Sequence, residues 1–133
     1  MLDKLLLGMH CTEVIKQDYG WTFVFDDRKA ILNLECPWRL LLRGCIAYGY
    51  EDDGQKFGLP EPVNGVQTTT KLIGRSPVVS ANVRRGPSDL IINFENGVSL
   101  EIFNMSSGYE AWVYNIKDGP TIVAQGGGDG SLL

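Results

Sequence analysis

The sequence predicts an α+β fold that is mainly β, with two antiparallel meanders of about four strands each and one helix between them. Two segments have the pattern of hairpins built on one plan, because apolar and polar residues alternate on both arms of each. Only one internal segment, residues 62–73, has helical spacing. A length of 133 residues suits a single domain over residues 1–133, and 44% hydrophobic with 21% charged residues is typical of a folded globular protein.

The first hairpin is predicted in WTFVFDDRKAILNLE, after a strand-like piece, TEVIKQ. Four residues, DDRK, form its turn, and this loop length sets the pairs Trp21–Leu34, Phe23–Leu32 and Phe25–Ala30 on one face. Val24 and Ile31 form an apolar pair on the other face, which needs a cover from the helix or from a second subunit.

The middle of the chain is predicted to hold one long strand, a loop and the helix. Residues 38–50 alternate and predict a half-buried strand with Gly44 as its bend or bulge, and residues 51–61 are rich in turn formers and predict a surface loop. The helix is expected to begin at Pro62 and to end before Gly74. Its predicted apolar stripe consists of Val63, Val66, Thr70 and Ile73. Three consecutive threonines give it a poor intrinsic propensity, so packing must hold it.

The second hairpin is predicted in LIINFENGVSLEIF, after the strand VVSANV. A two-residue Asn-Gly turn would mix apolar with polar residues on each face, whereas a three-residue loop gives the pairs Phe94–Val98, Ile92–Leu100 and Leu90–Ile102. We therefore choose the three-residue loop. A strand around residues 109–116 and a short one, TIVAQ, complete the chain. The two halves resemble a tandem repeat, although two unrelated hairpins would produce a similar pattern.

Charge and cysteine content narrow the classes of partner and compartment. Sixteen acidic and twelve basic residues give a net charge of −4, which argues against nucleic acid or an anionic membrane as a partner. Such a surface favours a basic protein as partner, although a mild acidic excess more often serves only solubility. No apolar run is long enough to span a bilayer, and the start, MLDKLLLGMHC, lacks the features of a secretory signal. We therefore expect a cytoplasmic protein. The three cysteines include no C-x-x-C pair and predict buried thiols in a reducing compartment.

Several segments resemble functional motifs but lack what the chemistry requires. The glycines at 126–128 and 130 are followed by no helix that could complete a phosphate loop, so a flexible or bulged tail is preferred. EDDG at 51–54 lacks the spaced oxygen ligands of a calcium loop. His10 and Cys11 are adjacent and would point to opposite faces of a strand. The aspartate pairs at 26–27 and 52–53 lie in predicted turns, where such residues bind backbone groups. The sequence thus predicts no catalytic residue, no metal and no cofactor.

The best candidate for a ligand or partner site is NMSSGYEAWVYN, residues 104–115. On a strand, Glu110, Trp112 and Tyr114 would share one face and Tyr109 the other. We favour a structural role for Glu110, in which its carboxylate accepts backbone N–H groups of the preceding Ser-Ser-Gly turn or a tryptophan N–H. Aromatic rings beside one carboxylate also suit a small polar ligand or a cationic side chain. The predicted binding residues are Tyr109, Glu110, Trp112 and Tyr114.

The order WTFVF, LNLECPWRL, DLIINFENGVSLEIF, YEAW and a terminal GGG resembles a family of small uncharacterised bacterial proteins. This resemblance implies a bacterial cytoplasmic protein and carries no activity, because the family has no established function. The first hypothesis is a non-enzymatic protein-binding module, such as an immunity-type protein that neutralises a basic toxin. The alternative is a small-molecule binder or enzyme with a pocket around Glu110, Trp112 and Tyr114. A third is a homodimer formed through exposed edge strands.

Overall fold

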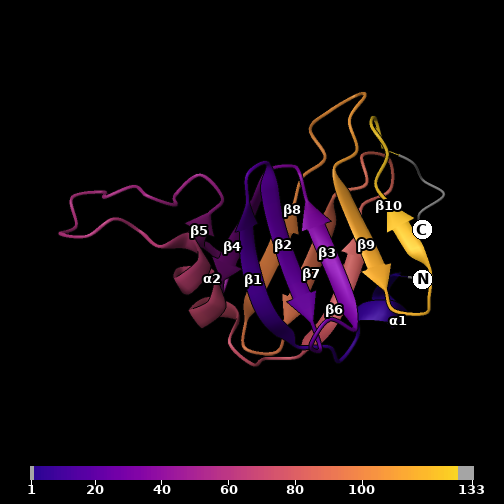
Figure 1. Ribbon diagram of the computed structural model, residues 1–133, viewed down its shortest axis with the longest axis horizontal. Helices are drawn as coiled ribbons and strands as arrows, with labels where there is room; N and C mark the ends of the chain where they lie inside the picture. The colour runs from indigo at the N-terminus through magenta and orange to yellow at the C-terminus, as the bar shows by residue number, and fades with distance from the viewer. Residues whose placement is uncertain (1, 129–133) are drawn as a thin grey trace.

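The computed structural model describes residues 2–128 and confirms the mainly β, antiparallel architecture. The described residues form ten strands and two helices, and two five-stranded sheets pack face to face (Figure 1). The first sheet has the order β1 (Cys11–Gln17), β2 (Gly20–Phe25), β3 (Ala30–Leu34), β9 (Trp112–Ile116), β10 (Thr121–Val123). The second has the order β5 (Cys45–Gly49), β4 (Trp38–Leu42), β8 (Val98–Ile102), β7 (Leu90–Phe94), β6 (Val78–Val83). The helices are α1 (Leu2–Leu6) and α2 (Gly65–Ile73).

Each sheet combines a three-stranded meander from one half of the chain with a hairpin from the other half. The meander β1–β2–β3 is extended by the hairpin β9–β10, and the meander β6–β7–β8 is extended by the hairpin β4–β5. Two segments cross between the sheets, one from β3 to β4 and one from β8 to β9. The predicted meanders of about four consecutive strands are therefore replaced by this exchange, because Pro37 and its neighbours carry the chain to the opposite sheet.

The two halves repeat one structural plan of a helix, a meander and a hairpin. Both first strands carry a β-bulge at the same register, between Cys11 and Glu13 in β1 and between Val78 and Ser80 in β6. Corresponding backbone bonds also recur: Met9 N–H donates to Leu6 O as Ser76 N–H does to Ile73 O, and Tyr50 N–H donates to Trp38 O as Ala124 N–H does to Trp112 O. The helices are exchanged as well, since α1 packs on β6 and α2 on β1. Trp38 and Trp112 thus occupy equivalent places.

Both predicted hairpin registers are confirmed. Trp21, Phe23 and Phe25 pair with Leu34, Leu32 and Ala30, and Leu90 and Ile92 pair with Ile102 and Leu100. These side chains are all buried between the sheets, which explains why the apolar pattern specifies the register. Val24 pairs with Ile31 as expected, and Val24 is 1% exposed within the single chain, so it needs no second subunit as a cover.

The structure corrects the region from residue 38 to residue 50. Two strands, β4 and β5, replace the single long strand, and they form a hairpin closed by Arg43 and Gly44. Both turn residues have positive φ, 50° and 85°, as a tight two-residue hairpin turn requires. Cys45 follows this turn at the exposed start of β5, so the expectation of three buried thiols is wrong for this one.

The predicted helix exists but begins later and buries a different stripe. Its N-cap is Asn64, whose side chain accepts the Gln67 N–H at 3.0 Å, so Pro62 and Val63 precede it. The buried residues are Gly65, Thr69 and Ile73. Gly65 decides this orientation, because it lets α2 approach the aromatic core more closely than any residue with a Cβ.

Neither helix in residues 2–128 is long and apolar enough to cross a membrane.

Candidate functional site

A surface cleft forms where the two crossover segments lie side by side. The segment from β3 to β4 contains Glu35, Cys36 and Pro37, and the segment from β8 to β9 spans residues 103–111. Glu35 N–H donates to Ala111 O and Phe103 N–H donates to Pro37 O, both at 2.9 Å. These bonds hold together two chain segments that are distant in sequence.

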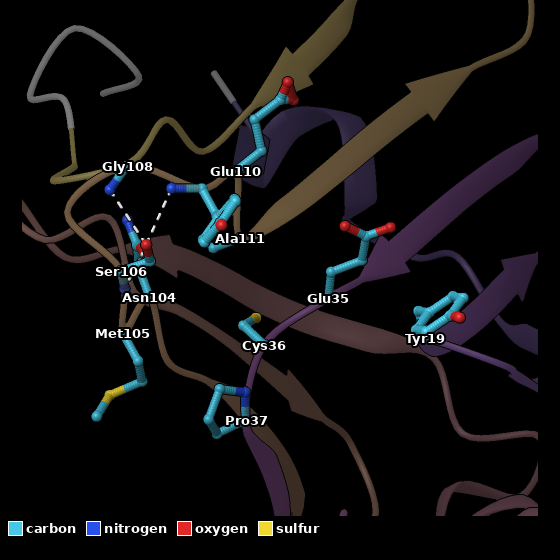
Figure 2. Close-up of a pocket in the computed structure, with 11 residues that line it drawn as sticks. Tyr19, Glu35, Cys36, Pro37, Asn104, Met105, Ser106, Gly108, Glu110 and Ala111 are labelled. Carbon is cyan, nitrogen blue, oxygen red and sulfur yellow. Dashed lines mark hydrogen bonds between the residues drawn. The ribbon is translucent and has the colours of Figure 1, made fainter.

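The cleft has a volume of about 640 Å³, and Figure 2 shows its lining. Tyr19, from the turn between β1 and β2, lies on one side, and the loop at residues 104–108 lies on the other, with Glu35 and Cys36 between them (Figure 2). The lining residues are Tyr19, Glu35, Cys36, Pro37, Asn104, Met105, Ser106, Gly108, Tyr109, Glu110 and Ala111.

Asn104 fixes the loop that forms one wall. Its side-chain amide donates to the carbonyls of Pro87 and Gln125, each at 2.9 Å, and its own backbone N–H donates to the Asp89 carboxylate at 2.9 Å. The Ser106 hydroxyl accepts the backbone N–H groups of residues 108 and 109, at 3.1 and 2.9 Å (Figure 2). The loop is therefore ordered by its own polar residues, which sequence reasoning did not single out.

The glycines at 126–128 pack closely against this loop and against residues 86 and 87. A Cβ on Gly126 would collide with the backbone of Gly108, and one on Gly128 would collide with the backbone of Gly86. Gly127 N–H donates to Ser106 O at 2.7 Å. Glycines are needed at 126 and 128 for close backbone packing, so of the two predicted alternatives, a flexible or a bulged tail, the flexible one is wrong for residues 126–128. Gly130, part of the same prediction, lies outside the described residues.

The structure separates the four predicted binding residues into two pairs. Tyr109 and Glu110 line the cleft, and both are exposed. Trp112 and Tyr114 are 1% and 0% exposed, and their polar atoms are used internally. Trp112 Nε1–H donates to Ser88 O and Tyr114 O–H donates to the carbonyl of Leu5, both at 2.9 Å. A single pocket that unites Glu110 with both rings is not formed.

The predicted structural role of Glu110 belongs instead to Ser106. The backbone N–H groups of this turn are accepted by the Ser106 hydroxyl, while the Glu110 side chain points away from the turn (Figure 2). The physical reason is that β9 begins at Trp112, two residues after Glu110, so Glu110 lies on the loop before the strand. Its carboxylate is left for solvent or for a partner.

The rim of the cleft combines exposed apolar side chains with negative charge. Tyr19, Met105 and Tyr109 are 89%, 74% and 83% exposed. Glu35 and Glu110 line the same cleft, and neither has an ion-pair partner among residues 2–128.

Two adjoining hollows share Tyr19 and Glu35 with the cleft and add the acidic residues Asp18 and Glu51. Lys16 is the only basic residue among the described residues that line these three hollows. The surface is thus acidic and aromatic, and we refer to the cleft with its two adjoining hollows as the crossover surface.

The cleft is poorly equipped to generate a nucleophile. Burial, followed by the carboxylates of Asp89 and Glu35, raises the pKa of the Cys36 thiol to about 12, which disfavours its thiolate. The described lining includes no histidine that could act as a base. Within residues 2–128, no group of three or more metal-binding side chains lies together.

The other residues that the sequence offered as candidates for chemistry, His10 and the turn aspartates, bind nearby groups of the chain. His10 lies beside Asp26, with its Nδ1 3.6 Å from the carboxylate, and the same carboxylate accepts the His10 backbone N–H. Asp52 accepts the N–H of Gly49, and Asp53 accepts that of Gly65. The turn aspartates at 52 and 53 therefore bind backbone groups, as predicted.

Comparison with protein-family models, with curated proteins and with solved structures found no match for this chain. The resemblance to a bacterial family consequently stays a prediction.

Proposed function

We propose that the protein is a non-enzymatic protein-binding module and that the crossover surface engages a basic segment of its partner. The observation that carries this proposal is the juxtaposition of Tyr19, Met105 and Tyr109, all more than 70% exposed, with the unpaired carboxylates of Glu35 and Glu110. Tyrosine and methionine are enriched in protein interfaces, and apolar side chains that are exposed together around one cleft are typical of an interaction site.

The chemistry of the surface selects the charge of the partner. Tyrosine rings and carboxylates together suit arginine or lysine, because a cation can stack on a ring and pair with a carboxylate at the same time. The rim is open to solvent on both tyrosines, which fits a side chain presented by another protein better than an enclosed small molecule. The predicted toxin-neutralising role is one form that such binding would take.

The test uses affinity capture with matched charge variants. The wild type is compared with Glu35→Lys/Glu110→Lys and with Glu61→Lys, a control on the exposed loop before α2. We expect a basic protein that binds the wild type and the control but not the double variant, and we expect its affinity for the purified wild type to fall as salt rises. Equal binding of the double variant, with its fold confirmed by circular dichroism, contradicts the proposal.

A further inference from the structure

Three buried polar atoms, one on α2 and two on the neighbouring strands β4 and β5, have no hydrogen-bond partner among residues 2–128. They are Trp38 Nε1, Tyr48 Oη and Thr69 Oγ1, on side chains that are 1%, 1% and 0% exposed. The backbone N–H of Asp53 approaches the Tyr48 oxygen and slightly opposes the rise that burial causes in its pKa, but it does not reach hydrogen-bond geometry. Each unpaired group destabilises the closed structure, since water would bind it in the unfolded chain.

Trp38 and Tyr48, which carry two of these atoms, form one ring cluster with Trp21, and α2, which carries the third, packs on this cluster through Gly65. The rings of Trp38 and Tyr48 are 5.6 Å apart, and Trp21 packs on both, at 5.0 and 6.4 Å. Gly65 of α2 lies directly against the Tyr48 hydroxyl and the Trp21 ring. Thr69 follows Gly65 by one helical turn on the same buried face of α2. We call Trp21, Trp38, Tyr48 and Thr69 the aromatic box.

The equivalent end of the sandwich shows that these unpaired groups are not imposed by the fold. There the ring equivalent to Trp38 is Trp112, and its N–H is satisfied by Ser88 O at 2.9 Å. The place of Tyr48, opposite Leu40 in the sheet, is taken by Ile122, opposite Tyr114.

The covering helices differ in the same way. Leu6 of α1 corresponds to Ile73 of α2, because Met9 and Ser76 bond to them identically. Four residues earlier, α1 has the buried Leu2 where α2 has Thr69. At the α1 end the helix therefore buries apolar side chains, whereas at the α2 end unpaired polar atoms are buried.

α2 is attached in a way that permits it to move. Asn96 donates to the carbonyls of Leu72 and Ile73, so the C-terminal end of α2 is tied to the turn between β7 and β8. The N-terminal end follows an irregular segment, residues 50–64, and the Asp53 carboxylate accepts the N–H of Gly65. Poor helix formers, three threonines and a glycine, make up much of the helix. Displacement about the C-terminal end would break no strand pairing.

We propose that α2 is a lid over a binding site formed by the aromatic box, and that this site takes a flat aromatic ligand with a hydrogen-bond acceptor on its edge. The indole N–H of Trp38 can only donate, so the ligand must supply an acceptor. The hydroxyls of Tyr48 and Thr69 can donate or accept, and the surrounding rings favour a planar group. A bound ligand satisfies the atoms that the closed lid leaves unpaired. This inference does not depend on the crossover surface.

The first experiment measures whether α2 opens on its own, by native-state hydrogen exchange of the full chain. We expect amides of residues 65–73 to exchange through a local opening that denaturant does not affect, while amides of β2 and β3 exchange only by global unfolding. Thr69→Val removes one unpaired hydroxyl and should slow the exchange of α2 by roughly fivefold. Thr68→Val makes the same change one residue away, off the buried face, and should not slow it. Exchange of α2 only by global unfolding overturns the lid.

The second experiment tests the ligand class with benzamide at millimolar concentration. Nitrogen-15-labelled protein reports the indole N–H resonances of Trp38 and Trp112 separately. We expect a saturable shift for Trp38 and none for Trp112, with no saturable shift from cyclohexanecarboxamide, which lacks the ring, or from toluene, which lacks the acceptor. An unmoved Trp38 resonance overturns the site for this ligand class. A long-lived water bound to the Trp38 N–H while α2 stays closed would also overturn the site, because that N–H would then have a partner.

Discussion

Tyr48 and Tyr114 test the comparison between the two ends of the sandwich. Removing the Tyr48 hydroxyl should raise stability, whereas removing the Tyr114 hydroxyl should lower it. Tyr114 O–H donates to Leu5 O at 2.9 Å and contacts Met9 Sδ at 3.6 Å. Tyr114→Phe removes that bond and leaves the carbonyl without it, so we expect a loss of about 1–1.5 kcal/mol in the free energy of unfolding. The Tyr48 hydroxyl is buried without a partner, so Tyr48→Phe should raise the free energy of unfolding by about 1 kcal/mol.

The two variants should therefore differ by about 2 kcal/mol, which corresponds to roughly 8 °C in Tm for a domain of this size. Urea unfolding followed by tryptophan fluorescence gives the free energy, and an unchanged urea dependence confirms that the same surface is exposed. Tyr19→Phe is the matched control, because Tyr19 is 89% exposed and its variant should match the wild type. If Tyr48→Phe destabilises as much as Tyr114→Phe, the Tyr48 hydroxyl has a hydrogen-bond partner and the closed α2 leaves no unpaired group there for a ligand to satisfy.

Three further predictions concern the loop, the thiols and the response to alkali. Asn104→Ala should lower the free energy of unfolding by about 2 kcal/mol, because three side-chain hydrogen bonds are lost. An unchanged urea midpoint would show that these bonds contribute nothing to stability. Iodoacetamide at about pH 8 should alkylate the exposed Cys45 much faster than Cys36, whose pKa burial raises to about 12, and peptide mapping that found equal rates would contradict this. Burial raises the pKa of Tyr114 to about 12, so between about pH 10 and pH 12 the folded state retains a proton that the unfolded state gives up. The contribution of Tyr114 to stability should therefore be full below about pH 10 and should fall as the pH rises to 12. A urea midpoint that stays constant over that range would refute this expectation.

Much of the fold could be predicted because alternation fixes which side chains face the core. Phe23 and Leu32 pair as expected, as do Ile92 and Leu100, and in each case a slip of one residue would expose a buried ring or branched chain. Alternation says nothing about which strands become neighbours. The exchange of hairpins, and the two-residue turn at Gly44 inside an unbroken alternating run, could not be predicted for this reason.

The candidate site was only half predictable for a related reason. The segment around Tyr109 and Glu110 was identified from its composition, but its partner across the cleft, Glu35, lies about 75 residues away, and only the crossover brings the two together. Trp112 and Tyr114 have the residue types of a binding site, yet they lie one step further along, where the strand has started and its side chains enter the core. Ser106 and Asn104 carried a usable signal, since such residues commonly order loops.

The exchange of hairpins has a consequence for how the chain folds. During synthesis, strand β3 can pair with its outer neighbour, β9, only after about 80 further residues have been added. Strand β4 likewise cannot pair with β8 until β8 has been synthesised. Neither half can complete a sheet alone, so a nascent or truncated chain presents the open edges of β3 or β4 to other molecules. Two chains that exchanged these hairpins with each other would satisfy the same pairings, so we expect domain-swapped dimers to form during refolding at high concentration.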